Sequence, residues 1–287
     1  MPEVDTFTTL SIITATHDRA ARLAATALPS IQQQTDPNFE WIIVNDGCDL
    51  NTRDWIANAQ LPCSVRYLEM PHPNVGFGLC HARNLGLAAA TADLVAYLDD
   101  DNAIAPDFVA ATCRFFQQHP TLRCSMVQQW RRRDQVAGDR LIRSGTPFVA
   151  PTTAATVEDV LTQRELFDSN GFTHRRAFAP QWNPSHRIFA DYEYFLQCLT
   201  CWGRSSFQLQ AAVRVEYVQR SDGIIGRSSF QDWAIELEQI LSHVEDYSVL
   251  EPAEICQLQA QVQRWQTAAA RHRAIPAFAA LPLDDKQ

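Results

Sequence analysis

Residues 94–102 read Leu94-Val95-Ala96-Tyr97-Leu98-Asp99-Asp100-Asp101-Asn102, an apolar run that ends in three consecutive carboxylates. The run is short, apolar and bounded by polar residues, which predicts a buried strand of a parallel sheet. Three neighbouring acids repel one another and cannot pack in a core. Because ligands of open α/β sheets bind at the carboxyl ends of the strands, Asp99–Asp101 are predicted to lie at a ligand site.

A divalent cation would relieve the repulsion within this acidic run. Carboxylates and the phosphate oxygens of a substrate together form the hard oxygen shell that Mg²⁺ or Mn²⁺ takes. For an arbitrary run of three aspartates, a solvated acidic turn is the better interpretation. The strand in front of the run, and the motifs described below, favour the metal site instead.

The composition is that of a globular, acidic protein. The chain has 287 residues, 46% hydrophobic and 20% charged, and its net charge is 24 − 33 = −9. This charge disfavours a nucleic-acid partner, which usually meets a basic face. Since the sequence contains neither a bilayer-length apolar stretch nor a secretory signal pattern, we expect a cytoplasmic location and no transmembrane segment, with peripheral membrane contact left open.

Strands and helices alternate in the first half of the chain, which predicts βαβ units and a mostly parallel sheet. The predicted strands cover residues 9–14, 41–44, 65–67 and 94–98. The predicted helices cover residues 20–33, 52–59, 80–90 and 106–119. Asp18 is the predicted N-cap of the first helix.

The second half is less regular. Strands are predicted at residues 126–130 and 212–218, and helices at residues 159–166, 191–201, 230–243 and 252–272. Residues 168–176 are predicted to form an edge or connecting segment. We interpret the basic run Arg131–Arg133 as a solvated face, with contact to a phosphate-bearing acceptor as the alternative.

Polar side chains follow three of the predicted strands. Thr14–His17 follow the first strand, Asn45 and Asp46 follow the second, and Asp99–Asp101 follow the fourth. In a doubly wound sheet these loops meet at one edge. Hydroxyls and one carboxylate suit a nucleobase and ribose, since a carboxylate accepts hydrogen bonds from a base N–H. Taken singly, each residue is better explained as an ordinary loop residue or cap, and it is their joint placement that indicates a nucleotide site.

The sequence lacks the glycine-rich loops that usually cradle phosphates. It contains no GxxxxGK[ST] motif and no GxGxxG after the first strand, and Gly76-Phe77-Gly78 is too short a match. Kinase-like and dinucleotide-binding modes are therefore disfavoured. A metal would have to hold the phosphates.

Five short motifs, in the order and spacing of one family, carry a resemblance. They are residues 11–18 (SIITATHD), 30–35 (SIQQQT), 41–48 (WIIVNDGC), 82–87 (ARNLGL) and 98–102 (LDDDN). They resemble the opening strand, the S-x-x-x-Q-T helix end, the I-I-V-x-D-G-S element, the A-R-N-x-G helix and the D-x-D motif of family 2 glycosyltransferases, whose fold is called GT-A. The ordered match covers residues 10–108, and a weaker one continues to about Arg227.

The resemblance implies roles at the base and the diphosphate of a nucleotide sugar. Thr14, Thr16 and Asp46 would line the nucleobase pocket, for uracil. Arg83 would sit near the diphosphate or brace the acidic loop.

The resemblance also implies a different role for each aspartate of the acidic run. Asp99 would approach the ribose, Asp101 would bind the metal that bridges the diphosphate, and Asp100 would be the structural member. The metal, Mn²⁺ or Mg²⁺, would act as a Lewis acid on the departing nucleoside diphosphate.

Transfer to a hydroxyl also needs a base, which in inverting relatives is the Asp of an E-D pair opening a late helix. Asp191, in Phe189-Ala190-Asp191-Tyr192-Glu193, is the matching candidate, and Glu193 is the fallback. On spacing alone, Asp191 would be a helix cap. The family's Glu is Ala190 here, which weakens the match.

A second departure lies after a late strand, where many relatives carry a His. The comparable positions here are Gln219 and Arg220, and one or the other would replace the His by contacting the phosphates. This leaves open whether the metal is essential.

Trp182 is interpreted either as a sugar-stacking side chain or as a core residue. His17 and His174 are interpreted as ordinary loop residues.

The sequence thus predicts an α/β, GT-A-type fold with a mostly parallel central sheet flanked by helices, plus C-terminal helices. Residues 1–125 would form the nucleotide-sugar-binding half, 126–228 the acceptor-binding and catalytic half, and 229–287 a helical extension. The predicted enzyme is an inverting hexosyltransferase with a UDP-linked donor and a carbohydrate or lipid-linked acceptor. The alternatives are a non-catalytic sugar-nucleotide-binding relative and a sugar-nucleotide nucleotidyltransferase.

Overall fold

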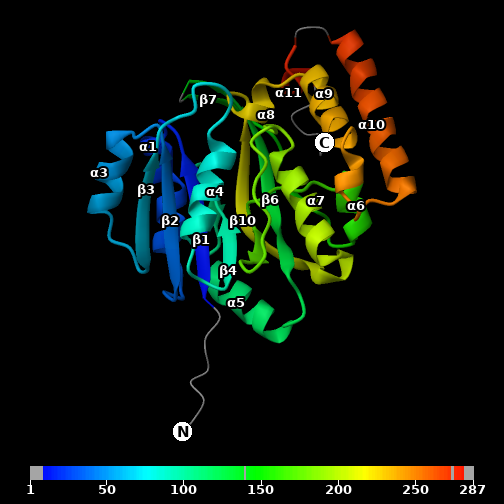
Figure 1. Ribbon diagram of the computed structural model, residues 1–287. Coiled ribbons are helices and arrows are strands. Elements are labelled where there is room, and N and C mark those ends of the chain that lie inside the picture. Colours follow the sequence, from blue (N-terminus) through cyan, green and yellow to red (C-terminus); the bar gives the residue numbers. More distant parts are fainter. Residues whose placement is uncertain (1–8, 139, 273–274, 281–287) are drawn as a thin grey trace. The chain divides into compact units, whose positions relative to one another are not determined.

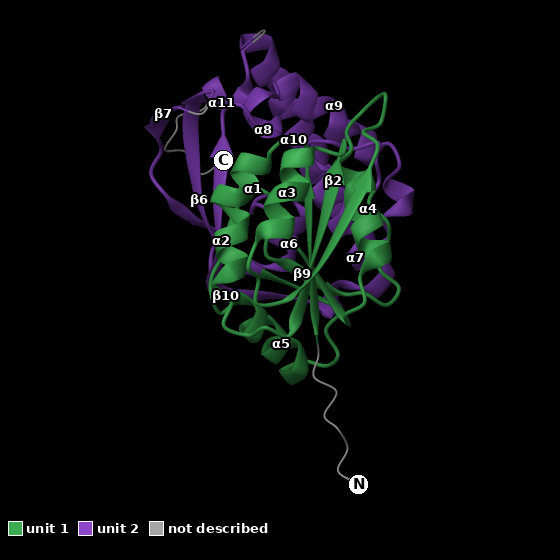
Figure 2. Ribbon diagram, turned by 90° about the vertical axis from the view of Figure 1, so that its left-hand side faces the viewer, with its two compact units in different colours: residues 1–126, 169–182 green, residues 127–168, 183–287 purple. Residues whose placement is uncertain are grey.

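The computed structural model (Figure 1) describes residues 9–138, 140–272 and 275–280. Within these residues the chain folds into two compact units (Figure 2). The first contains the chain up to Met126 together with Ser169–Trp182, and the second contains Val127–Asp168 and everything from Asn183 onward. The predicted division into a donor half, an acceptor half and a helical extension is a division by function, and it stays a prediction.

The first unit is built on a sheet whose strands run in the order β3-β2-β1-β4-β9. The pairs β3–β2, β2–β1 and β1–β4 are parallel, as predicted, and β9 is antiparallel to β4. Strands β1, β2 and β4 are almost wholly buried, which matches their apolar sequences. The elements of this unit are β1 (Leu10–Thr16), α1 (Ala20–Ala25), α2 (Ala27–Gln32), β2 (Phe39–Asp46), α3 (Leu50–Asn58), β3 (Ser64–Met70), α4 (Leu79–Ala89), β4 (Leu94–Tyr97), β5 (Ala103–Ile104), α5 (Phe108–Gln118) and β9 (Phe172–Arg175).

Helices cover both faces of these parallel strands. Helices α1, α2 and α3 lie over one face and α4 over the other (Figures 1 and 2). Helix α4 approaches β1 closely at Gly86, where an added Cβ would lie 2.5 Å from Cγ2 of Ile13. The glycine of the A-R-N-x-G motif therefore allows α4 to pack directly on the central strand.

The predicted helix over residues 20–33 is wrong in one respect, because it is two helices that meet at Thr26. Pro29 explains the break, since a proline clashes with the carbonyl four residues earlier, here that of Ala25, and cannot donate a helical hydrogen bond. Asp18 is not the N-cap: it has a positive φ of 50°, and Arg19 occupies the cap position.

The segment predicted as an edge or connection is an interior strand, β9. It pairs with β4 on one side and with the first three residues of β6, Cys124–Met126, on the other. The sequence did not indicate an interior strand, because two of the four residues of β9, Thr173 and His174, are polar yet buried. The imidazole of His174 bonds the hydroxyl of Tyr97 on the neighbouring strand, at 3.0 Å, so its burial leaves a polar group satisfied.

The second unit combines long antiparallel strands with helices. Past Met126, β6 pairs with β8 and β7, and β10 is its other neighbour. Helices α9 and α10 pack side by side, with Trp233 edge-on to Trp265 at 5.5 Å. The elements are β6 (Cys124–Ala137), β7 (Arg140–Ser144), β8 (Phe148–Ala150), α6 (Val157–Leu161), α7 (Ala190–Trp202), η1 (Arg204–Ser206), β10 (Phe207–Arg220), α8 (Ile224–Arg227), α9 (Phe230–Leu241), η2 (Val244–Asp246), α10 (Pro252–Arg271) and α11 (Ala277–Ala280).

The basic run Arg131–Arg133 is not a solvated face. It lies within β6, and Arg131 and Arg133 are buried. The guanidinium of Arg131 lies 3.8 Å from the ring centre of Tyr217, and Arg133 donates to Gln219 at 3.1 Å. These partners on β10 explain how two arginines can be buried in a strand.

No helix among the residues that the structure describes is both long and apolar enough to span a bilayer.

Candidate active site

The predicted donor-site residues all belong to the first unit. Thr14, Thr16 and Asp46 lie near the ends of β1 and β2, Asp99 and its two neighbours follow β4, and Arg83 lies on α4. Thr16 at the end of β1 is paired with Asn45 on β2, and the N–H of Leu98, directly after β4, donates to Ile13 of β1 at 3.0 Å. The loops after β1, β2 and β4 therefore leave the sheet at the same edge. This is the arrangement expected of a ligand site in an open α/β sheet.

Asp99 is held in place from two sides. The Asn170 side chain accepts from the Asp99 N–H at 2.7 Å and donates to Oδ2 at 2.8 Å. Arg83 donates to the other carboxylate oxygen, Oδ1, at 2.9 Å. The Asp99 side chain is 29% exposed, so it is oriented by buried partners and still reaches solvent.

Asp100 is the buried member of the run, with 3% exposure. The hydroxyl of Thr16 donates to it at 2.8 Å, and Nη1 of Arg19 lies 3.4 Å away. Burial raises the pKa of Asp100 above its ordinary value, against the opposing effect of Arg19. Asp100 thus links the loop after β4 to the end of β1, which fits the structural role expected of it.

Asp101 also lies in an unfavourable electrostatic environment. Burial, and then the charges of Asp100 and Asp99, raise its pKa to about 7. Arg19 forms an ion pair with it, with Nη1 3.3 Å from Oδ2. A nearby cation would stabilise the charged form of a carboxylate whose pKa is this close to neutral pH. Its oxygens are the hard donors that Mg²⁺ or Mn²⁺ prefers. The donor set therefore fits a divalent metal whose remaining ligands come from water and substrate.

Arg83 is buried, with 1% exposure, and lies against aromatic rings. Its guanidinium carbon is 4.3 Å from the ring centre of Trp182 and 5.7 Å from that of Tyr97. Trp182 is itself 1% exposed, so it is a core residue that supports Arg83 and not an open sugar-stacking platform. Of the two roles implied for Arg83, bracing the acidic loop is the one with a contact in the structure.

Asp46 ends β2 and is 3% exposed. Its Oδ2 lies 2.9 Å from Nδ1 of His72, and its backbone carbonyl lies 2.6 Å from Nδ1 of His17. Gly78 presses against the carboxylate so closely that an added Cβ would lie 1.7 Å from Oδ2. No described residue donates a hydrogen bond to the other oxygen, Oδ1. Asp46 is therefore a buried acceptor with bonding capacity left over.

The two predicted threonines have structural partners. Thr14 is wholly buried, and its hydroxyl accepts a hydrogen bond from the indole N–H of Trp41 at 2.9 Å. Thr16 is buried and bonds Asp100, as described above. The Thr14 hydroxyl thus links β1 to β2, and the Thr16 hydroxyl links the end of β1 to the loop after β4.

Asp191, the candidate base, belongs to the second unit and lies in the first turn of α7, one residue after its first residue, Ala190. The backbone before the helix is fixed by Glu236, whose Oε1 accepts from the N–H groups of residues 187, 188 and 189 at 2.6, 2.7 and 2.8 Å. Glu193, the fallback, is 2% exposed and accepts hydrogen bonds from Gln197 and Tyr247. Glu193 is thus a buried residue with structural hydrogen bonds, which favours Asp191 as the candidate base.

The two residues considered as replacements for the late His also have partners. Gln219 accepts from Arg133 at 3.1 Å, and Arg220 forms an ion pair with Asp222 at 3.0 Å. Arg220 also donates to the carbonyl of Gly138 at 3.2 Å.

Sequence reasoning missed three contributors: Arg19, His72 and Asn170. Arg19 lies two residues after the first strand-end cluster, and a cation in that loop was a usable signal. His72 and Asn170 gave none, because their roles depend on contacts with Asp46 and Asp99, 26 and 71 positions away.

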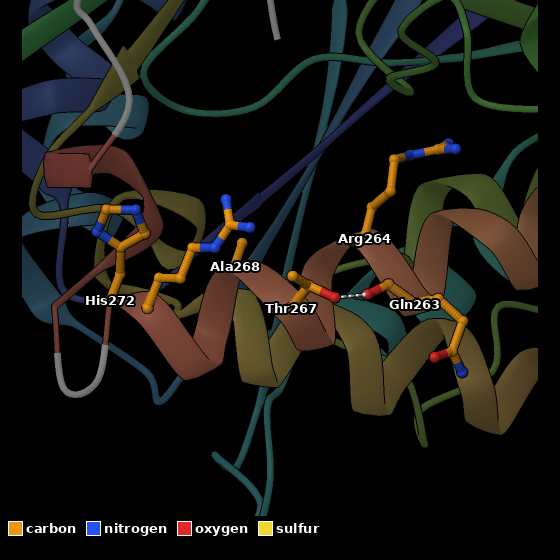
Figure 3. Close-up of a pocket in the computed structure, with 6 residues that line it drawn as sticks. Gln263, Arg264, Thr267, Ala268 and His272 are labelled. Atoms are coloured by element: carbon orange, nitrogen blue, oxygen red, sulfur yellow. Dashed lines mark hydrogen bonds between the residues drawn. The ribbon is translucent and has the colours of Figure 1, made fainter.

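A separate hollow lies on the second unit (Figure 3). Its lining comes from the end of α10 and includes none of the predicted site residues. All of its lining residues are exposed or half-buried, so it is an open surface groove and not an enclosed pocket. The lining residues are Gln263, Arg264, Thr267, Ala268, Arg271 and His272.

Comparison with known proteins identifies similar chains. The family described as "Glycosyl transferase family 2" matches residues 11–179. A chondroitin synthase of Escherichia coli is 35% identical over 100 residues, which is 35% of this chain and 14% of the relative. An uncharacterized glycosyltransferase of Haemophilus influenzae is 30% identical over 127 residues, 42% of this chain and 41% of the relative. The chain thus spans less than half the length of either relative.

A solved structure shares the fold. The crystal structure of S. aureus TarS 1–349 in complex with UDP matches with a TM-score of 0.61 at 15% identity, over 92% of this chain and 73% of that one. At this identity the likeness concerns the fold alone, and it agrees with the expected α/β, GT-A-type architecture.

Proposed function

The chain belongs to glycosyl transferase family 2, and we propose that it transfers a hexosyl group from a UDP-linked sugar to an acceptor hydroxyl, with inversion at the anomeric carbon. The acceptor is proposed to be a carbohydrate or a lipid-linked sugar. Family membership speaks against the nucleotidyltransferase alternative. UDP as the donor nucleotide is supported by the UDP complex of S. aureus TarS, which shares the fold.

One observation carries the proposal most strongly. The carboxylates of Asp99, Asp100 and Asp101 are concentrated at the ligand-binding edge of the sheet, with one of them raised to a pKa of about 7. Clustered carboxylates with a raised pKa are typical of functional sites, where a cation and an anionic substrate use their charge. A nucleoside diphosphate with a divalent metal supplies both.

Donor binding is assigned to the three strand ends. Asp46 would accept a hydrogen bond from the uracil N–H through its carboxylate, which has spare acceptor capacity. Thr14 and Thr16 would shape the nucleobase pocket by fixing the ends of β1 and its neighbours. Asp99, partly exposed and held by Arg83 and Asn170, would accept from the ribose hydroxyls.

Asp101 would hold Mn²⁺ or Mg²⁺. The buried Asp100 would fix the loop after β4 through its hydrogen bond with Thr16. When bound, the metal supplies a Lewis acid that offsets the charge of the departing diphosphate. Without the metal, the ion pairs of Arg19 with Asp100 and Asp101 would offset the repulsion between these two carboxylates. Arg83 orients Asp99 without reaching solvent itself.

Asp191 is proposed as the general base. Its carboxylate would take the proton of the acceptor hydroxyl while the acceptor oxygen forms a bond to the anomeric carbon and the bond from that carbon to the diphosphate oxygen breaks. A single displacement of this kind inverts the anomeric configuration. Glu236, by holding the backbone at residues 187–189, would position the turn that carries Asp191.

The experiment is a donor panel of UDP- and GDP-linked sugars, with and without Mn²⁺, measuring binding and transfer. Asp101→Ala is expected to weaken donor binding at least tenfold. Asp191→Asn is expected to keep donor affinity while losing on the order of 10² or more in transfer rate, the range of a general base. Glu245→Gln, an exposed acid of the same unit, is the control and should transfer normally.

Each result bears on a different part of the proposal. Normal transfer by Asp191→Asn would overturn the base assignment. A product with retained anomeric configuration would overturn the single displacement. Donor binding without transfer in the wild type would support a non-catalytic relative, and the absence of any nucleotide-sugar binding would contradict the proposed activity.

A further inference from the structure

Three side chains from three separate loops meet beside β2. His17 follows β1, Asp46 ends β2, and His72 follows β3. One ligand atom from each lies within 4.8 Å of the others. The two imidazole rings are stacked, with centres 4.1 Å apart and planes inclined by 19°. This cluster plays no part in the proposed metal binding by Asp101.

The distances suit a small metal ion. Nδ1 of His72 is 2.9 Å from Oδ2 of Asp46, and Nδ1 of His17 is 4.0 Å from the same oxygen. In a tetrahedral zinc site, metal–ligand bonds of about 2.1 Å place neighbouring ligand atoms about 3.4 Å apart. The two observed distances bracket this value. Because a metal lies in the plane of each imidazole that binds it, the two rings would have to rotate out of their stacked arrangement to share one ion.

The chemistry of the cluster differs from that of the acidic run. Two imidazoles and one carboxylate form a borderline donor set that suits Zn²⁺, Co²⁺ or Ni²⁺ better than Mg²⁺. The imidazoles are accessible, since the side chains of His17 and His72 are 45% and 39% exposed, while the side chain of Asp46 is buried. A metal can therefore enter from solvent and meet a preformed buried carboxylate.

A second observation points to a ligand at this place. Oδ1 of Asp46 is buried and accepts no hydrogen bond from any residue that the structure describes. A buried carboxylate oxygen without a donor is costly, and a hydrogen bond from the nucleobase proposed above would offset that cost. The metal would take Oδ2 instead, the oxygen that faces both imidazoles. Gly47, with a φ of 101°, brings its backbone close to the His17 ring and leaves no side chain to block the approach.

We propose that His17, Asp46 and His72 form a transition-metal site that takes Zn²⁺, separate from the Mn²⁺ or Mg²⁺ site of Asp101. Both imidazoles would present a deprotonated Nδ1 to the metal, giving up the hydrogen bonds that they now make to Asp46. A fourth position would be open to water. The metal would tie together the loops that follow β1, β2 and β3.

The test is a titration of the chelator-treated full chain with Zn²⁺ by calorimetry, repeated with Co²⁺ to record its visible absorption. It needs no donor, so it is independent of the proposed transferase activity. His17→Gln and His72→Gln are each expected to weaken Zn²⁺ binding at least tenfold, and His81→Gln, exposed on α4, should leave it unchanged. Because both imidazoles of the cluster are well exposed, these variants should fold.

A thiol could compete for the metal, since Cys48 is exposed two residues after Asp46. Cys48→Ser is expected to retain Zn²⁺ binding, and the Co²⁺ spectrum should lack a thiolate charge-transfer band. Zn²⁺ should also raise the Tm of the wild type and not that of His72→Gln, because a ligand that binds only the folded state stabilises it. Unchanged binding in both histidine variants, loss of binding in Cys48→Ser, or no Zn²⁺ binding by the wild type would each overturn the proposal.

Discussion

The guanidinium of Arg83 donates to Asp99 at 2.9 Å while its central carbon lies 4.3 Å from the ring centre of Trp182. One buried side chain thereby connects the acidic loop after β4 to helix α4 and to the aromatic core. The position of Asp99 at the edge of the sheet depends on this connection and on Asn170.

Replacing Arg83 with Met should therefore destabilise the fold and loosen Asp99. The substitution leaves a partly buried carboxylate without its cation, which costs about 3–5 kcal/mol when a buried pair is broken. Urea unfolding measures the change. The control is Arg53→Met, which breaks an exposed pair with Glu69 and should leave stability nearly unchanged, because exposed ion pairs contribute little. Equal losses in the two variants would show that Arg83 is no more than a surface charge.

Glu236 should act on transfer through position and not through contact with substrate. Glu236→Ala removes the acceptor of three backbone N–H groups before α7, which should cost about 2–4 kcal/mol of stability. We expect kcat to fall with little change in the KM of the donor, because the donor groups belong to the other unit. Glu236→Gln, which keeps a carbonyl acceptor, should recover most of the loss, and Glu238→Ala on the exposed side of α9 should change neither parameter. A fall in donor affinity with kcat intact would contradict this role.

Acid stability should depend on His174. Burial lowers the pKa of His174 from 6.5 to about 4, so the unfolded chain binds a proton there more readily than the folded one. The stability contributed by the neutral imidazole is complete above pH 6.5 and is lost as the pH falls toward 4, by about 3 kcal/mol in total.

The measurement compares free energies of unfolding at pH 7.5 and 4.5 in the wild type and in His174→Gln. The wild type should lose more than the variant by a margin of about 2–3 kcal/mol. Taking the difference between the wild type and the variant removes the contributions of Asp100 and Asp101, whose raised pKa values act in the opposite direction. The exposed His243→Gln should keep the wild-type dependence, and a matching slope in His174→Gln would refute the assignment.

The acidic run should be a site where function is kept at the expense of stability. Asp101→Asn removes one of three neighbouring charges, and at pH 8 without metal it should raise the free energy of unfolding by about 2 kcal/mol, a value reduced because the side chain is 22% exposed. Asp54→Asn on the exposed face of α3 should change stability by less than about 0.5 kcal/mol. If Asp101→Asn is destabilising, the ion pair with Arg19 outweighs the repulsion within the run.

Much of the first unit was predictable because its strands are continuous apolar runs followed by polar clusters. The break at Thr26 was also readable, since Pro29 cannot continue a helix through Ala25. Strand β9 was not, because the burial of Thr173 and His174 depends on Tyr97 and on strands distant in sequence. The same holds for Arg131 and Arg133, whose partners lie on β10, more than 80 residues away.

In the site, the sequence indicated which residues carry charge but not how those charges are balanced. The motif order predicted Asp46, Arg83 and Asp99–Asp101 at one edge of the sheet, and the structure places all of them in the first unit, with the acids directly after its parallel strands. The contact of Arg19 with the acidic run had a signal in the sequence, but the contacts of Asn170 with Asp99 did not. Such contacts arise between loops whose conformations no local pattern specifies.

The most direct test of the donor site is the calorimetric affinity for UDP with and without Mn²⁺, in the wild type and in Asp101→Asn, with Asp54→Asn as control. We predict that Mn²⁺ strengthens UDP binding at least tenfold in the wild type and in the control, and that Asp101→Asn loses this gain. The same affinity with and without Mn²⁺ in the wild type, or a full gain in Asp101→Asn, would contradict a metal-assisted donor site at Asp101.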